Sequence, residues 1–161
     1  MMGVMRIETI STDQQPVRDL IAIHLAGMHA SSPPENVFAL DLSGYARPNL
    51  SLWGAWRGEA LAGMIALQRL GDGPDGQGVA EIKSMRTHPD HLGQGVAQAL
   101  LEHLIMVARG EGLSRLSLET GRGEAFEPAL ALYRRRGFVD GEAFSDYEPS
   151  DFSQFLHLDL R

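Results

Sequence analysis

The segment from residue 79 to residue 101, VAEIKSMRTHPDHLGQGVAQALL, constrains the fold of this chain more than any other. Its pattern predicts a strand, then a short loop with one proline, then an amphipathic helix that begins at Gly93–Gln94–Gly95. A helix N-terminus leaves backbone N–H groups without partners, and the helix macrodipole favours negative charge there. Because Gly95 has no side chain, a ligand can approach this backbone closely. The segment therefore predicts a site for a phosphate or pyrophosphate.

Two well-known phosphate loops do not fit this segment. A nucleoside-triphosphate loop requires GxxxxGK[ST], and the chain contains no Gly-Lys pair. A dinucleotide-binding turn requires GxGxxG after the first strand of a βαβ unit, whereas GQGVAQ lacks the third glycine and follows a long N-terminal region. The run from Leu92 to Ala97 instead resembles motif A, [RQ]xxGx[GA], of the GNAT superfamily of N-acetyltransferases. Leu92 departs from that pattern, because it stands where the family usually has Arg or Gln.

A second block strengthens the resemblance. The run from Ala129 to Phe138, ALALYRRRGF, is similar to the A-x-x-LY-x-x-x-GF block of the same family, and it follows motif A in the family's order. The resemblance implies an α/β fold of the GNAT (acyl-CoA N-acyltransferase) type. In that fold a mixed central β-sheet is flanked by helices, and its fourth and fifth strands splay apart to form a cleft.

Hydrophobic periodicity along the whole chain agrees with that order of elements. The expected strands are residues 6–10, 50–56, 61–70, 79–87, 113–120, 138–144 and 153–160. The expected helices are a first one that starts at Pro16 and stops before Pro33–Pro34, then 37–45, 95–109 and 128–136, with a glycine-rich loop at 71–78. No repeat or long linker divides the chain, so we expect a single domain over residues 1–161.

Composition narrows the function further. The net charge of −7 argues against a nucleic-acid partner, which needs a basic face. No apolar run approaches about 18 residues and the N-terminus lacks a signal-peptide pattern, so we expect no membrane partner and a cytoplasmic protein. The absence of cysteine excludes disulfides, thiolate metal sites and an acyl-cysteine intermediate. His88 and His91 flank a proline in a loop without a third ligand, so no metal site is expected.

The resemblance implies acetyl-CoA as co-substrate. Main-chain groups of Met85, Arg86 and Thr87 would pair with its pantetheine arm. Backbone groups of the loop and first helical turn would hold its pyrophosphate, at Leu92, Gly93, Gln94, Gly95, Val96, Ala97 and Gln98. The departure at Leu92 removes a side-chain contact to phosphate but leaves these backbone donors.

Acyl transfer to an amine needs an acid and a base. Tyr133 is the expected acid, because a phenol with a pKa near 10 can protonate or steady the leaving thiolate. An alkylammonium has a pKa near 10.4, so a base must remove its proton before attack. Glu81 is the first candidate, although Lys83 on the same strand face can simply pair with it. Glu119 is the rival, and a water chain without either carboxylate stays open.

The acceptor pocket is expected between the first two helices and the strand that holds Trp53. Its candidate residues are His24, His29, Ser31, Glu35, Asp41, Trp53 and Tyr147. Phe126 occupies a place where many relatives carry Asn, which removes one supporting contact. The expected acceptor is a primary amine, either of a small molecule or as an exposed amino group such as a protein N-terminus, and the choice between monomer and homodimer stays open. A non-catalytic acyl-CoA-binding sensor or interaction domain is the alternative function.

Overall fold

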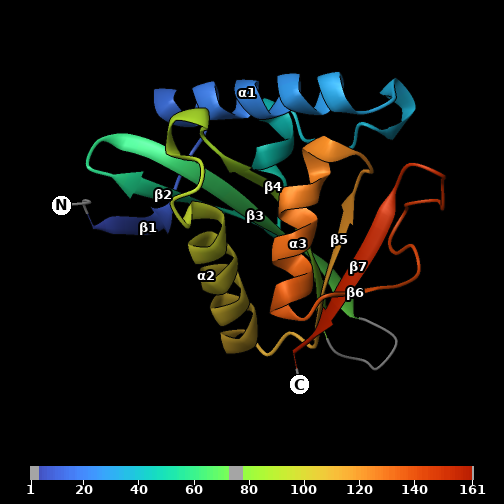
Figure 1. The fold of residues 1–161 in the computed structure, drawn as a ribbon. Helices are drawn as coiled ribbons and strands as arrows, with labels where there is room; N and C mark the ends of the chain where they lie inside the picture. The colour runs from blue at the N-terminus through green and yellow to red at the C-terminus, as the bar shows by residue number, and fades with distance from the viewer. Residues whose placement is uncertain (1–3, 73–77, 161) are drawn as a thin grey trace.

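The computed structural model describes residues 4–72 and 78–160. Its strands are β1 (Met5–Thr9), β2 (Leu50–Arg57), β3 (Ala60–Asp72), β4 (Gly78–Thr87), β5 (Arg115–Thr120), β6 (Val139–Asp140) and β7 (Gln154–Asp159), and its α-helices are α1 (Gln15–Ser31), α2 (Val96–Gly110) and α3 (Glu127–Arg136). The strands form one seven-stranded mixed sheet in the order β1-β2-β3-β4-β5-β7-β6 (Figure 1). This confirms the predicted fold class.

The two central strands separate partway along their length. β4 and β5 run parallel and pair at Val79–Arg115, Ala80–Leu116 and Glu81–Ser117. Beyond Glu81 the two strands are not paired, whereas β4 continues to pair with β3 as far as Thr87. The predicted splay is therefore present, and Glu81 lies where the opening begins.

Helices cover both faces of the sheet. α1 packs Val17, Leu20 and Ile21 against Met64 and Ala66 of β3. On the other face, α2 and α3 cover a larger core of alternate strand residues, among them Ile65, Leu67, Ile82, Leu116 and Leu118. Because side chains alternate along a strand, Glu81, Lys83 and Glu119 face the side of α1. Figure 1 shows α2 and α3 side by side in front of the sheet.

The structure corrects two expected elements. In place of a helix over 37–45 there is a 3₁₀ turn, η2 (Leu42–Ala46), and another 3₁₀ turn, η1 (Pro34–Asn36), precedes this range. Asp41 accepts a hydrogen bond from the Gly44 N–H at 2.9 Å, which favours a short turn over a longer helix. The strand expected at 138–144 is limited to β6, and the Glu142 carbonyl beyond it lies 2.8 Å from the Nε2 atom of the His157 side chain. Residues 73–77 of the expected loop lie outside the described residues.

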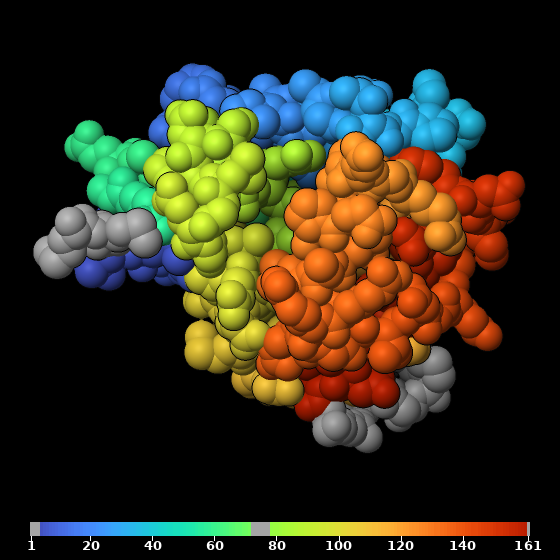
Figure 2. Space-filling view, in the orientation of Figure 1, coloured from blue at the N-terminus to red at the C-terminus, as the bar shows by residue number. Residues whose placement is uncertain are grey.

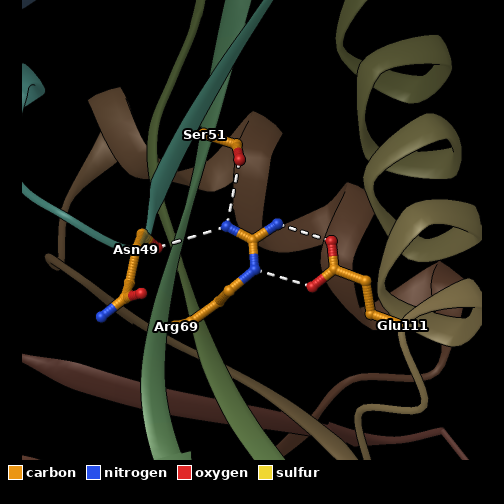
Figure 3. Close-up of polar contacts among 4 residues, drawn as sticks. All are labelled: Asn49, Ser51, Arg69 and Glu111. Carbon is orange, nitrogen blue, oxygen red and sulfur yellow. Dashed lines mark hydrogen bonds and ion pairs between the residues drawn. The ribbon is translucent and has the colours of Figure 1, made fainter.

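A bidentate ion pair ties the end of α2 to the sheet (Figure 3). Arg69 of β3 donates from Nε to Glu111 at 2.7 Å and from Nη2 to the same carboxylate at 2.5 Å. The Nη1 atom of Arg69 also donates to the Ser51 hydroxyl at 3.0 Å and to the Asn49 carbonyl at 3.3 Å. Bidentate arginine–carboxylate pairs are geometrically specific, so this contact helps to set the position of α2 on β2 and β3.

Candidate active site

The N-terminus of α2 has the geometry of an anion site. Gly93 and Gly95 have φ angles of +72° and +80°, and a Cβ at either position would meet no atom within 4 Å. No side chain caps the helix, and its first main-chain hydrogen bond runs from the Ala99 N–H to the Gly95 carbonyl at 3.0 Å. In the described part of the chain, the preceding N–H groups of the first turn therefore have no helical partner. An anion can approach these donors without steric hindrance.

A β-bulge shapes β4 beside the opening. Met64 pairs with Arg86 and Ala66 pairs with Lys83, so Ile65 alone faces both Ser84 and Met85. Ser84 has a φ angle of +58°, and its hydroxyl lies 2.7 Å from that of Tyr45. A bulge bends the strand and redirects its side chains. This bulge lies beyond the last β4–β5 pair, so it bends β4 where the strand edge that faces β5 is unpaired.

A cavity of about 590 Å³ occupies the opening between β4 and β5. One end is bounded by the N-terminal turn of α2 and by α3, and the other by α1, Phe38 and Tyr147. Figure 2 shows the surface hollowed between the yellow-green loop before α2 and the orange α3. The cavity thus connects the candidate anion site with the carboxylates on the α1 side of the sheet.

Tyr133 lies on α3 against the bulge of β4. Its side chain is buried, and its hydroxyl donates to the sulfur of Met85 at 3.6 Å. Burial raises the pKa of the Tyr133 phenol above its usual value. A phenol in this state keeps its proton at neutral pH, so it can donate a hydrogen bond to a group that gains negative charge in the cavity.

A polar cluster lies at the start of the opening. The Glu81 carboxylate accepts from the Tyr147 hydroxyl at 2.5 Å and from the Lys83 ammonium at 3.3 Å. Lys83 also donates to the Tyr147 oxygen at 3.0 Å. Edge-on contacts with Phe38 at 5.0 Å and Phe144 at 5.2 Å between ring centroids hold the Tyr147 ring. The pairing of Lys83 with Glu81 that the sequence suggested is therefore present.

Glu119 is the second carboxylate of the cavity and stands near the end of β5. Burial raises the pKa of Glu119 to about 7, and the nearby Glu81 charge adds to this rise. The Ser153 hydroxyl and the Lys83 ammonium act in the opposite direction. A carboxylate with a pKa near neutrality is suited to accept and release a proton at physiological pH.

His24 lies on the inner face of α1 and lines the cavity. Its Nδ1 accepts a hydrogen bond from Arg86 Nε at 2.9 Å. Burial lowers the pKa of His24 to about 3, and the positive charges of Arg86 and Lys83 add to the effect. The imidazole is thus neutral and weakly basic, which favours a positioning role over that of a general base.

The structure brings together most, but not all, of the expected site residues. Those that line the cavity are His24, Ser31, Glu81, Met85, Arg86, Thr87, Leu92, Gly93, Gly95, Val96, Ala97, Gln98, Glu119, Tyr133 and Tyr147. Trp53 is buried in the core with its ring against His103, because its β2 position faces α2 rather than α1. His29, Glu35, Asp41 and Gln94 are exposed and lie outside the lining.

Several lining residues were absent from the sequence-based set. These are Gly27, Met28, Phe38, Ala39, Lys83 and Ser84 among others. Lys83 and Ser84 lie on the same strand as Glu81, so their place in β4 could have indicated that they line the cavity. No local sequence pattern identifies Phe38 as a cavity residue. It reaches the cavity because of the path of the irregular segment between η1 and η2.

Two further observations concern the described residues alone. No group of three or more His, Asp or Glu side chains in residues 4–71 and 78–160 is arranged to hold a metal ion. Within the same ranges, no helix is both long and apolar enough to cross a membrane.

The chain is similar to known proteins over most of its length. A model of the acetyltransferase (GNAT) family matches residues 17–138. The uncharacterized N-acetyltransferase YedL of Escherichia coli strain K12 is 43% identical over 155 residues, covering 94% of each chain. The uncharacterized N-acetyltransferase YsnE of Bacillus subtilis strain 168 is 43% identical over 152 residues, covering 94% of this chain and 97% of its own. A crystal structure assigned as an acyl-CoA N-acyltransferase, from Klebsiella pneumoniae, has a TM-score of 0.75 at 25% identity, covering 98% of this chain and 99% of its own.

Proposed function

The chain belongs to the GNAT family of acyltransferases, which use acyl-CoA, and we propose that it transfers an acetyl group from acetyl-CoA directly to a primary amine. The observation that carries this proposal is the continuous cavity from the N-terminus of α2 to Glu119. Donor and acceptor can meet there in one ternary complex. The absence of cysteine supports direct transfer without an acyl-cysteine intermediate. The N-acetyltransferase relatives favour this enzyme over a non-catalytic acyl-CoA sensor.

The residues that would hold the donor are those of the anion site and of the free strand edge. The backbone N–H groups at the start of α2 would bind the pyrophosphate. The edge of β4 from Met85 to Thr87 is not paired with β5, so its main-chain groups are free to pair with the amide-containing pantetheine arm. Leu92 is 65% exposed and supplies no polar group, so we assign phosphate binding to the backbone.

We assign the role of general base to Glu119 rather than to Glu81, which the sequence placed first. One oxygen of Glu81 already accepts hydrogen bonds from Tyr147 and Lys83. Glu119 instead combines an open position beside the cavity with a pKa near neutrality. Glu119 would deprotonate the acceptor ammonium, Glu81 would hold Tyr147 and Lys83 in place, and Tyr133 would protonate the leaving thiolate.

Replacing Tyr133 with phenylalanine tests the acid. We expect kcat to fall by roughly 100- to 10,000-fold, because general acid catalysis contributes effects of this order. The Kd for acetyl-CoA should change little, since the ring and its packing against Phe138 are kept. Steady-state kinetics and calorimetric titration measure the two quantities. A variant with unchanged kcat would remove Tyr133 from the mechanism.

Calorimetric titration with acetyl-CoA tests the proposed function itself. Free CoA and NAD serve as comparators, and CoA release with a panel of amines then measures turnover. The absence of protein cysteine removes a background signal from thiol detection. Acetyl-CoA binding together with amine-dependent CoA release would support the proposal. Absence of acetyl-CoA binding would contradict it.

A further inference from the structure

The side chain of Arg86 extends to the α1 side of the sheet. Arg86 pairs with Met64, which packs beneath α1, so both residues occupy the same face. Its Nε donates to His24 Nδ1 at 2.9 Å and its Nη2 donates to the His24 carbonyl at 3.5 Å. An arginine has five N–H donors, so three remain without an acceptor among the described residues. The side chain lines the cavity, where these donors can meet a ligand.

Within the described part of the chain, no negative charge compensates that of Arg86. No carboxylate in residues 4–71 and 78–160 forms an ion pair with it. Of the side chains that the structure describes, only His24 is hydrogen-bonded to Arg86, and His24 is neutral because its pKa is lowered to about 3. Burial lowers the pKa of the Arg86 guanidinium itself. A half-buried cation usually has an anionic partner, because partial loss of water is unfavourable for a charge.

α1 is shaped to accommodate this guanidinium. A Cβ at Gly27 would lie 3.0 Å from Nη2 and 3.3 Å from Cζ of Arg86. Glycine is less favourable than alanine in a helix interior, yet it occurs here within α1, one helical turn after His24. Gly27 thus leaves space for the plane of the guanidinium against the helix backbone.

We propose that Arg86 binds a carboxylate of the acceptor, so that the substrates are amines that also carry a carboxylate, such as amino acids. This rests on the proposed function, because it names the substrate class of the same site. The planar guanidinium can bind a carboxylate through two parallel hydrogen bonds. The acceptor amine then lies toward Glu119 and Glu81, which share the α1 face with Arg86.

The location of Arg86 favours the acceptor over the donor as its ligand. The anion site of the donor lies at the N-terminus of α2, which packs on the opposite face of the sheet. Tyr133 and Met85 also meet on that opposite side. The backbone N–H groups at the start of α2 can therefore bind the phosphates of acetyl-CoA. The side chain of Arg86 is then available to bind a second anion.

The test compares matched amines with and without a carboxylate. The probes are glycine, β-alanine, 4-aminobutanoate, methionine, glutamate and phenylalanine. Each is compared with the compound in which a primary amide replaces its α-carboxylate or, for β-alanine and 4-aminobutanoate, its terminal carboxylate. Wild-type protein should show a kcat/KM for at least one carboxylate that exceeds that of its amide by roughly 10- to 100-fold. Arg86→Met should abolish this preference through KM, and Arg86→Lys should keep part of it. Arg109→Met, an exposed change on α2, is the control for net charge.

Several results would overturn the proposal. The proposal would be overturned if the wild-type protein had equal kcat/KM for each carboxylate probe and its amide. This result does not depend on whether Arg86→Met folds. The proposal would also be overturned if folded Arg86→Met lost affinity for acetyl-CoA but kept the preference for a carboxylate over its amide. In that case Arg86 would bind acetyl-CoA rather than the acceptor. Acetyl-CoA binding without turnover of any carboxylate probe would contradict the substrate class alone. Absence of acetyl-CoA binding by wild-type protein would instead contradict the proposed function as well.

Discussion

Gly95→Asp should weaken acetyl-CoA binding by more than roughly 100-fold. A carboxylate at the first turn of α2 would stand where the backbone N–H groups are expected to hold a pyrophosphate. Two like charges about 4 Å apart near a protein surface repel by about 4 kcal/mol, and about 1.4 kcal/mol corresponds to a tenfold change in Kd. Calorimetric titration of the variant with acetyl-CoA measures the loss.

Gly95→Asn is the matched control for that variant. Gly95 has a φ angle of +80°, a left-handed conformation that Asn and Asp both tolerate better than other side chains. The two variants share size and backbone strain, so their thermal melting temperatures should be similar. The Asn variant should bind acetyl-CoA much more tightly than the Asp variant. Equal affinity in both would show that the start of α2 does not contact an anion.

Glu119→Gln should lower kcat by roughly 100- to 10,000-fold, the range that general base catalysis contributes. In the wild type, a base with a pKa of about 7 must be deprotonated to act. The value of kcat/KM should therefore rise with pH through about 7 and level off above it. The Gln variant cannot lose that proton, so this limb of its pH profile should be absent. Its acetyl-CoA affinity should stay close to that of the wild type.

Glu81→Gln separates the two carboxylates. An amide at position 81 can still accept from Tyr147 or Lys83 but carries no charge. Removing the Glu81 charge takes away one cause of the raised pKa of Glu119. The acidic limb should therefore shift to lower pH in Glu81→Gln but persist. Loss of the limb in this variant, with the limb retained in Glu119→Gln, would make Glu81 the base.

Local patterns were sufficient to predict most of the fold. The amphipathic period of α2 and the alternation of β4 arise from residues close together in the chain. The splay of β4 from β5 was implied only by resemblance to the family, and the register of the two strands confirms it. The 3₁₀ turns at 34–46 were missed, because short turns depend on single hydrogen bonds such as that of Asp41.

Contacts between distant segments were decided by the tertiary structure. Tyr147 hydrogen-bonds to Glu81, 66 residues earlier, and this contact leaves Glu119 as the more available carboxylate. Arg86 was expected to act through its main chain, yet its side chain meets His24, 62 residues earlier. Trp53 faces the core rather than the pocket, because strand register determines which face each side chain occupies. The sequence by itself determined the elements and the family, since these follow from local periodicity and motif spacing. Only the packing of those elements decided the burial, charge environment and partners of the site residues.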